Sequence, residues 1–313
     1  MDDRGLAQAR RILTDLELFR RINDRDLEVT RLGGLTNLVF RVDHGNQRYV
    51  LRVPGQGTEE YINRTHEARA AIEAARVQVS PAVLHVDPAT GVMVTRFVDN
   101  ATTMSAEAFR TAPGAPGRAG AVLRQLHSSG AAFTFRFELF AMIDDYLKVL
   151  ASKNIELPVG YHDVVREAGA VRAALNAHAL PQSACHCDPL CENFLDAGDR
   201  MWLVDWEYSG MNDPLWDLGD LSIEGGFSEM QDEDMMRAYF GGEARPTDRG
   251  RMIIYKAMCD LLWTLWGLIQ HANRNPLDDF WIYSLRRFER CKALMAAPGF
   301  SRHVHDVRVG ERA

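Results

Sequence analysis

The stretch of chain that decides the fold covers residues 186 to 208 and reads HCDPLCENFLDAGDRMWLVDWEY. Two short apolar runs flank the polar turn 196–200, a pattern that predicts a tight β-hairpin. Asn193 precedes the first strand of this hairpin and Asp205 ends the second, so both side chains are expected at the same end. Asp188 lies one loop away. The pattern therefore brings three oxygen-bearing side chains together.

Phosphoryl transfer needs a set of side chains of this kind. One carboxylate orients an attacking hydroxyl group and accepts its proton, while an Asn and a second Asp hold magnesium on the phosphates of ATP. Magnesium prefers hard oxygen ligands and few protein carboxylates, which fits one Asp and one Asn. The stretch thus predicts a phosphoryl-transfer site that uses ATP and Mg²⁺.

Two other interpretations of the same residues stay open at this point. Asp and Asn at turns often serve only as local caps. Four neighbouring residues also resemble a zinc site, although they lack a C-x-x-C pair and a second half-site. These four are Cys185, His186, Cys187 and Cys191.

The predicted secondary structure differs between the two parts of the remaining chain. Before Asp99 it predicts a helix over 5–22, a helix capped by Thr58 that runs to Val77, and strands at 27–32, 38–43, 48–53, 82–86 and 92–98. After Asp99 it predicts helices near 118–129, 138–153, 161–178, 229–240, 247–273 and 279–297, with the Pro/Gly cluster 112–120 as a surface loop. We expect an α+β fold with a small sheet-rich lobe, 1–98, and a larger helical lobe, 99–313.

Composition excludes several classes of protein. The chain has 313 residues, 46% of them hydrophobic and 25% charged, as in a soluble globular protein. Its net charge of -7 argues against a nucleic-acid-binding surface. The apolar segment 252–269 contains Lys256 and Asp260, which favours a buried helix over a membrane span. The absence of an N-terminal apolar stretch and the odd number of cysteines predict a cytoplasmic location.

The central stretch resembles a known catalytic loop. H-x-D-x-x-x-x-N followed by a strand and an Asp is similar to the loop of the aminoglycoside phosphotransferase and choline kinase superfamily, whose members have a bilobal, protein-kinase-like fold. The continuation D-W-E-Y-S-G-M-N-D-P-L-W-D-L-G-D-L resembles the choline/ethanolamine kinase family. The resemblance implies that Asp188 is the catalytic base, that His186 supports the loop, and that Asn193 and Asp205 bind magnesium. Asp217 would anchor the loop.

The N-terminal part of the chain also resembles this family, in the residues that would bind the nucleotide. A Gly-Gly-Leu-Thr-Asn turn at 33–37 resembles the family's phosphate loop, and the strand Y-V-L-R-V-P-G resembles the strand that bears a phosphate-binding cation. The family pairs this cation with a Glu of the next helix; Glu67 is the expected partner, although Glu73 competes for the role. Farther along the chain, a strand resembles the hinge of this family, whose backbone groups would bind the adenine. The nucleotide-binding residues implied are Gly34, Thr36, Asn37, Arg52, Glu67, Phe97 and Val98.

The C-terminal part of the chain contains candidate residues for binding the molecule that accepts the phosphoryl group. Trp263 and Trp266 lie at i and i+3 on one helix face, a spacing that ordinary core packing also produces. Choline kinases carry a similar W-x-x-W helix that walls their cation site, because aromatic faces attract a quaternary ammonium group. By this resemblance the acceptor-binding residues are Glu207, Glu224, Trp263, Trp266 and Tyr283. The sequence departs from the family at Leu190 and Cys191, and no tyrosine follows Glu224 where the family's cage has one.

Together these patterns predict an ATP- and Mg²⁺-dependent kinase that phosphorylates choline or a related cationic alcohol. A kinase for an aminoglycoside, thiamine or a sugar is the alternative within the same chemistry. A pseudokinase that binds nucleotide without turnover is a further alternative. It would be expected to lose Asp188, Asn193 or Asp205, and all three are present. The oligomeric state stays open.

Overall fold

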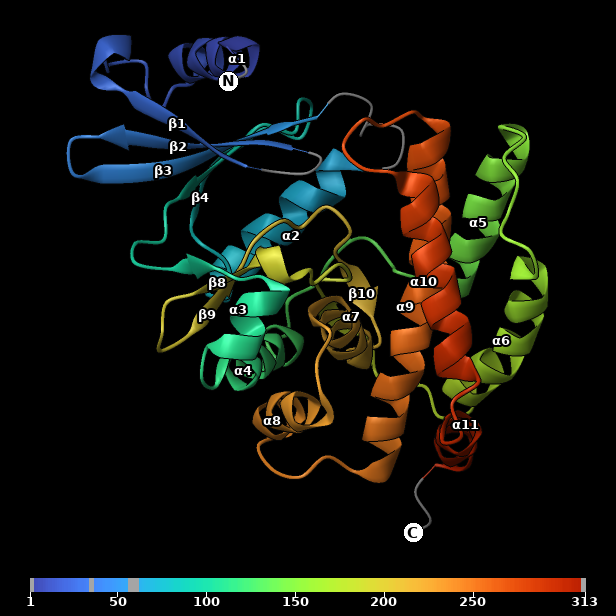
Figure 1. Ribbon diagram of the computed structural model, residues 1–313. Coiled ribbons are helices and arrows are strands. Elements are labelled where there is room, and N and C mark those ends of the chain that lie inside the picture. Colours follow the sequence, from blue (N-terminus) through green and yellow to red (C-terminus); the bar gives the residue numbers. More distant parts are fainter. Residues whose placement is uncertain (1–2, 34–36, 56–61, 311–313) are drawn as a thin grey trace.

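The structure is a computed structural model that describes residues 3–33, 37–55 and 62–310. A five-stranded sheet forms the N-terminal region, and a larger helical region follows it (Figure 1). The predicted α+β class is confirmed. The division into lobes at residue 98 stays a prediction.

The sheet is antiparallel, with strand order β1-β2-β3-β5-β4. Its strands are β1 (Glu28–Gly33), β2 (Asn37–His44), β3 (Gln47–Pro54), β4 (Val83–Val86) and β5 (Met93–Arg96). Helix α1 (Asp3–Asp15) covers one face, where its Leu13 shares a buried cluster with Phe40 and Leu51. The sheet matches the strands expected from alternating apolar residues. Helix α1 is shorter than predicted.

Helix α2 (Arg64–Arg76) lies against the opposite face of the sheet (Figure 1). The side chain of Asn63 caps it by accepting hydrogen bonds from the amides of Thr65 and His66, at 3.0 and 3.2 Å. The helix therefore begins later than predicted, because Asn63 supplies the cap that we assigned to Thr58. Thr58 itself lies outside the described residues.

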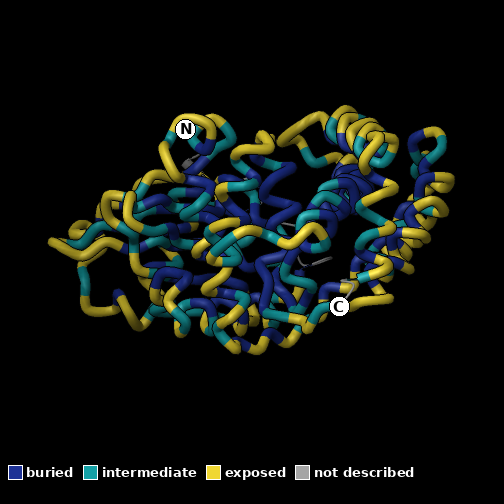
Figure 2. Tube along the Cα trace, turned by 90° about the horizontal axis from the view of Figure 1, so that it is seen from below, coloured by how far each residue is buried: buried dark blue, intermediate teal, exposed yellow. Residues whose placement is uncertain are grey.

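The helices of the helical region are α3 (Ala106–Thr111), α4 (Ala115–His127), α5 (Leu139–Ser152), α6 (Tyr161–Ala177), α7 (Leu215–Gly225), α8 (Glu229–Phe240), α9 (Pro246–Ala272), α10 (Phe280–Met295) and α11 (Phe300–Val309). In this region α5, α6, α7, α10 and α11 pack against α9, while α4 packs mainly against α8. Figure 2 shows buried segments in the interior of the molecule and exposed segments along its outer edges, and most residues of α9 are buried. Helix α9 is long and apolar enough to cross a membrane, but 83% of its apolar window is buried within the protein, so it is weak evidence for a span.

The Pro/Gly cluster 112–120 is not the surface loop that we predicted. Helix α4 begins at Ala115, and Pro116 fits its first turn because the first amides of a helix have no intrahelical partner. Gly120 is buried against α8, where a methyl group on it would lie 2.2 Å from the carbonyl oxygen of Met235. Proline and glycine here serve a helix start and a close helix contact. Helices α3, α7 and α11 were not predicted.

Short strands complete the region and shape the central stretch. These are β6 (Thr102–Thr103), β7 (Ser183–Cys185), β8 (Phe194–Asp196), β9 (Met201–Leu203) and β10 (Gly210–Asn212), in the orders β6-β8-β9 and β10-β7. The predicted hairpin is present as β8 and β9, with Phe194 opposite Leu203.

The hydrophobic residues form two separate clusters. One lies between α1 and the sheet. The other fills the helical region and also includes Ala70, Ala71 and Ala74 of α2 and Met93 of β5. Helix α2 therefore packs with the helical region as well as beneath the sheet.

Candidate active site

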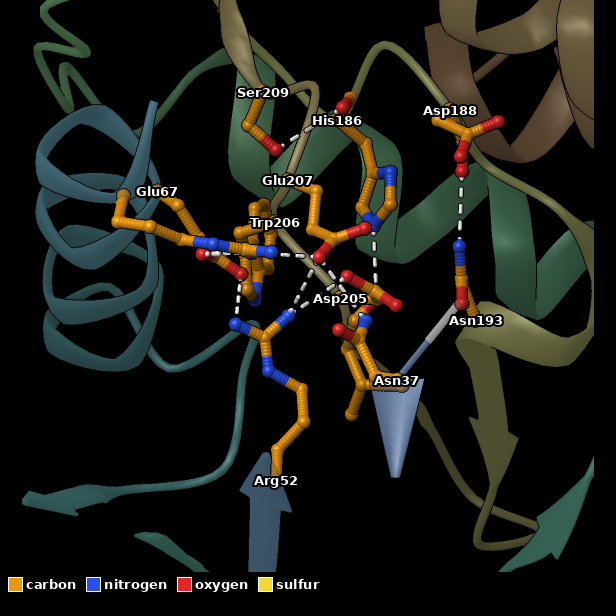
Figure 3. A network of polar contacts seen from close by, with 12 residues as sticks. Asn37, Arg52, Glu67, His186, Asp188, Asn193, Asp205, Trp206, Glu207 and Ser209 are labelled. Atoms are coloured by element: carbon orange, nitrogen blue, oxygen red, sulfur yellow. Dashed lines mark hydrogen bonds and ion pairs between the residues drawn. The ribbon is translucent and has the colours of Figure 1, made fainter. Parts of the chain in front are cut away.

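The β8–β9 hairpin positions the oxygen-bearing side chains. Residues Cys191–Asn193 form a 3-10 turn that leads into β8, and the Val204 amide donates to the Asn193 carbonyl at 3.0 Å. This bond fixes the start of β8 beside the end of β9, which brings Asn193 next to Asp205. The side-chain amide of Asn193 donates to the carbonyl of Asp188 at 3.0 Å. The three predicted residues are thus brought together (Figure 3).

Asp217 of α7 holds the loop that carries Asp188. Its carboxylate accepts hydrogen bonds from the amides of His186 and Cys187, at 2.7 and 2.8 Å, and lies 2.9 Å from Nε2 of His127. Cys187 has a left-handed backbone, with φ of 67°, a conformation that costs energy for a non-glycine residue. The buried hydrogen bonds to Asp217 hold this turn in place, so the anchoring role predicted for Asp217 is present in the geometry.

His186 supports the same loop from the inside. It is fully buried, and its Nε2 donates to the carbonyl of Val204 at 2.9 Å. Burial lowers the pKa of His186 below its usual value, although the charge of Asp217 opposes this. The hydrogen bond to Val204 links the loop to the hairpin, which agrees with the supporting role predicted for His186.

The carboxyl group of Asp188 is strongly affected by its surroundings. Burial raises its pKa well above the usual range, and the charges of Asp205 and Glu224 raise it further, while Arg287 opposes them. A raised pKa makes a carboxylate a stronger base, and such shifts are common at active sites. The geometry therefore supports the role of proton acceptor predicted for Asp188.

Asp205 belongs to a group of three acids. Carboxylate oxygens of Glu67, Asp205 and Glu207 lie within 4.8 Å of one another. Burial and the charge of Glu207 raise the pKa of Asp205 to about 7, with Arg52 opposing. Asp205 also has a left-handed backbone, with φ of 67°, which turns its side chain back toward the loop. An added cation would relieve this crowding of negative charge.

The donor atoms in this place fit magnesium. Because the amide nitrogen of Asn193 is used within the loop, its Oδ1 remains as a neutral oxygen ligand beside the carboxylate of Asp205. Hard oxygen donors with one or two carboxylates are what magnesium prefers. The acids also exceed the cations here, since Glu67, Asp205 and Glu207 face two guanidinium groups.

Arg52 points from β3 into the group of acids (Figure 3). Its guanidinium forms an ion pair with Glu67 and lies 3.3 Å from Asp205 and 3.4 Å from Glu207. Glu73, the competing partner on α2, instead pairs with Arg76 at the surface. The structure thus brings Arg52 and Glu67 together, as the family pattern implies.

Glu207 lies at this nucleotide end, although we predicted it for the acceptor pocket. Its Oε1 accepts from Nδ2 of Asn37 at 3.1 Å and lies 2.7 Å from Nη1 of Arg64. Asn37 is the first residue of β2, so Glu207 ties the start of β2 to the segment that follows β9. Gly34 and Thr36 lie outside the described residues.

The predicted hinge is only partly available for a nucleotide. The amide of Phe97 donates to the carbonyl of Arg48 at 3.1 Å and therefore belongs to the sheet. The remaining backbone groups of Phe97 and Val98 follow β5 at the boundary with the helical region.

At the other end of Asp188 lies a cluster of aromatic side chains. Trp266 donates from Nε1 to the hydroxyl of Tyr208 at 2.8 Å, and Tyr208 meets Trp263 edge to face at 5.4 Å between ring centroids. Trp266 also meets Phe280 and Tyr283 at 5.6 and 5.8 Å. The two tryptophans are therefore linked through Tyr208. Trp263 is only 4% exposed.

Arg287 of α10 closes the acceptor end. Its guanidinium lies 4.7 Å from the ring centroid of Tyr283, 2.6 Å from Glu224 and 3.2 Å from Asp260. Glu224, predicted to meet the acceptor, is thus already paired within the protein. A cavity of about 550 Å³ opens beside these residues, and its lining includes Glu224, Asp279, Tyr283, Arg286, Arg287 and Arg290.

Sequence reasoning missed four residues of this arrangement. They are Arg64, Tyr208, Asp220 and Arg287. Spacing offered a signal for two of them: Arg64 precedes Glu67 by three residues, and Asp220 follows Asp217 by three, so each pair shares a helix face. Arg287 gave no such signal, because its partners lie on other helices.

Comparisons with known proteins agree with this geometry. The model of the phosphotransferase enzyme family matches residues 28–253. A choline/ethanolamine kinase family protein from Mesorhizobium loti has a crystal structure with 65% identity and a TM-score of 0.89, covering 98% of this chain and 100% of that one. The choline kinase LicA from Streptococcus pneumoniae has 24% identity and a TM-score of 0.75, with 91% and 98% covered.

A structure of LicA in complex with AMP is also similar, with 26% identity, a TM-score of 0.71, and 90% of this chain and 96% of that one covered. The family model matches more than half of the chain, and the Mesorhizobium loti protein matches nearly all of it. The chain belongs to the phosphotransferase enzyme family and, within it, to the choline/ethanolamine kinase family.

Proposed function

We propose that this small-molecule kinase transfers the γ-phosphoryl group of ATP to the hydroxyl group of choline or a related amino alcohol. The observation that carries the proposal is the position of Asp188 between a nucleotide end, built around Arg52, and an aromatic acceptor end. The relatives named LicA choline kinase, and the AMP complex of LicA, support the same reaction.

Asp188 would accept the proton of the acceptor hydroxyl. The hydroxyl oxygen then bonds to the γ-phosphorus while the bond from that phosphorus to the β–γ bridging oxygen breaks, and ADP leaves with the electron pair. Arg52 and Asn37 would position the phosphates, together with Gly34 and Thr36. Asn193 and Asp205 would hold Mg²⁺, which when bound neutralises charge on the phosphate oxygens.

The acceptor end suits a small organic cation. Trp263, Trp266 and Tyr283 supply aromatic rings, and a cation over such a ring gains about 0.5–2 kcal/mol. Acidic groups on α7 add a negative potential there. A neutral sugar would gain neither contribution, which favours an amino alcohol.

The remaining parts of the proposal concern the adenine contacts, the cellular location and the charge of the substrate. Phe97 and Val98 would contact the adenine through their free backbone groups. The five cysteines are unpaired and buried, as expected in a reducing compartment, so we propose a cytoplasmic enzyme. Its net charge of -7 favours small cationic substrates over nucleic acid.

A coupled assay for ADP tests the proposal. The purified protein is given ATP and Mg²⁺ with choline and ethanolamine, and in parallel with an aminoglycoside, thiamine and a hexose. We expect acceptor-dependent ADP formation with the amino alcohols and its loss when the metal is chelated. Turnover of an aminoglycoside, thiamine or the hexose, with none of the amino alcohols, would contradict the proposal.

A further inference from the structure

Helix α7 presents a row of acids that starts at the catalytic loop and ends in the acceptor pocket. Asp217, Asp220 and Glu224 are spaced by three and four residues, so they share one face of the helix. Asp217 holds the amides of the residues just before Asp188. Asp220 follows about one helical turn later, roughly 5 Å along the axis, and Glu224 one turn after that.

Asp220 lies beside Trp263, beneath the cavity lining to which Glu224 belongs. It differs from Glu224 and Asp260 because no described cation forms a salt bridge with it. Glu224 and Asp260 each form ion pairs with Arg287, and Asp260 also pairs with Arg290. Asp220 is 0% exposed, and among the described residues it forms no salt bridge. Its Oδ2 accepts one long hydrogen bond, 3.4 Å from Nε1 of Trp263, and its Oδ1 accepts none.

Such an atom is uncommon, because buried polar groups are nearly always hydrogen-bonded. Burial and the charges of Glu224 and Asp188 raise the pKa of Asp220 well above its usual range, although Arg287 opposes them. Its Oδ1 therefore lacks a hydrogen-bond donor, and the carboxyl group lacks a salt-bridge partner among the described residues. A ligand that brings an N–H group with a positive charge supplies both.

The aromatic rings nearby are largely engaged already. Tyr208 and Trp263 pack against each other, Trp266 packs against Tyr283, and the guanidinium of Arg287 lies over the Tyr283 ring. Aromatic faces are what a fully methylated ammonium group needs, since it has no N–H bond to donate. The pocket thus offers an unused hydrogen-bond acceptor more clearly than it offers unused faces.

We infer that Asp220 receives the ammonium group of the acceptor, and that the preferred acceptors are amino alcohols that keep at least one N–H bond. This inference rests on the proposed function and narrows its substrate class. A site whose buried polar group pairs with a substrate N–H discriminates against the analogue that lacks it, because the group is then left unpaired.

The test is a series that removes N–H bonds one at a time. Ethanolamine, N-methylethanolamine, N,N-dimethylethanolamine and choline are compared by kcat/KM at a pH where all are cationic. We expect the largest step, about 10- to 100-fold, between the dimethyl compound and choline. That step removes the last N–H bond but adds only one methyl group. Choline turned over as well as the dimethyl compound would overturn the inference, and turnover of none of the four would overturn it together with the proposed function.

Two matched variants assign the effect to a residue. Asp220→Asn keeps the shape of the side chain but removes its charge, and we expect it to reduce the dimethylethanolamine-to-choline ratio to about 1–3. Glu224→Gln is the control, because Arg287 already pairs with Glu224; it should change kcat/KM for all four acceptors by a similar factor. Retained nucleotide binding and thermal unfolding show that each variant is folded. If Glu224→Gln abolishes the discrimination and Asp220→Asn preserves it, Asp220 is not the ammonium partner. If Asp220→Asn does not fold, the wild-type series alone decides.

Discussion

Asp188 combines two requirements that oppose each other. A base must be deprotonated to accept a proton, yet burial and neighbouring acids favour its protonated form. The fold keeps it in place through backbone atoms rather than through its carboxylate: Asp217 binds the preceding amides, and Asn193 binds its carbonyl. None of these contacts uses the carboxylate, which suits the role of base that we propose for Asp188.

Asp188→Asn should leave the loop intact, because none of these contacts uses the side chain of Asp188. We expect kcat to fall by about 10²- to 10⁴-fold, the usual contribution of a positioned base, while ATP still binds. Single-turnover kinetics and nucleotide titration measure the two quantities. Glu192→Gln, an exposed change in the same loop, is the control and should keep kcat within about 2-fold. Activity near the wild-type value in Asp188→Asn would remove Asp188 from the role of base.

At the scale of elements, local sequence patterns correctly predicted the strands and the hairpin that depend on neighbouring residues. The β8–β9 hairpin followed from two apolar runs around a polar turn, and β1 to β5 followed from alternation along each strand. Helix α7 escaped prediction although nearly all of its residues are buried. We interpreted the acidic residues of α7 as the continuation of the catalytic-loop motif, and for that reason Asp220 was missed.

The start of α4 was mispredicted for a different reason. Proline and glycine usually mark loops, but Pro116 stands where a helix begins and Gly120 where two helices meet. Only the position of α8, which the sequence around α4 does not reveal, distinguishes these uses. Likewise Arg287 reaches its partners through packing between α7, α9 and α10, and no sequence spacing encodes those contacts.

A pair of glycine substitutions tests the contact between α4 and α8. Alanine favours a helix over glycine by about 1 kcal/mol, so Gly169→Ala in α6, where nothing lies within 4 Å, should raise the free energy of unfolding by up to that amount. Gly120→Ala makes the same chemical change, but its methyl group would collide with the backbone of Met235. We expect it to lower the free energy of unfolding by about 1–3 kcal/mol. Urea unfolding measures both, and equal gains in the two variants would disprove the close contact.

At the scale of the whole molecule, Glu207 joins the two regions. It stands just after β9 in the helical region, and its partners Asn37, Arg52 and Arg64 come from β2, β3 and α2. A single carboxylate thus holds the start of β2 and two arginines together. Its neighbour Asp205 gains its position from the same stretch of backbone.

Glu207→Gln should therefore weaken nucleotide binding more than acceptor binding. Losing the charge of a buried, multiply bonded carboxylate costs about 1.5–3 kcal/mol, so we expect the Kd for ATP to rise about 10- to 100-fold. The KM for the acceptor should stay within about 2-fold. Calorimetry and steady-state kinetics measure these values, and Glu73→Gln, which breaks a surface pair on α2, is the control. A defect in acceptor KM alone would return Glu207 to the acceptor pocket.

The two separate hydrophobic clusters have a consequence for cooperativity. The sheet with α1 and the helical body each have their own apolar interior, so each is a candidate folding unit that can open while the other persists. Arg52, rooted in the sheet, and Glu67, rooted in a helix that packs with the body, form one of the links between these units. A nucleotide held between them would add to that linkage by mass action. Cellular ATP would then set how far the enzyme melts as one unit or two.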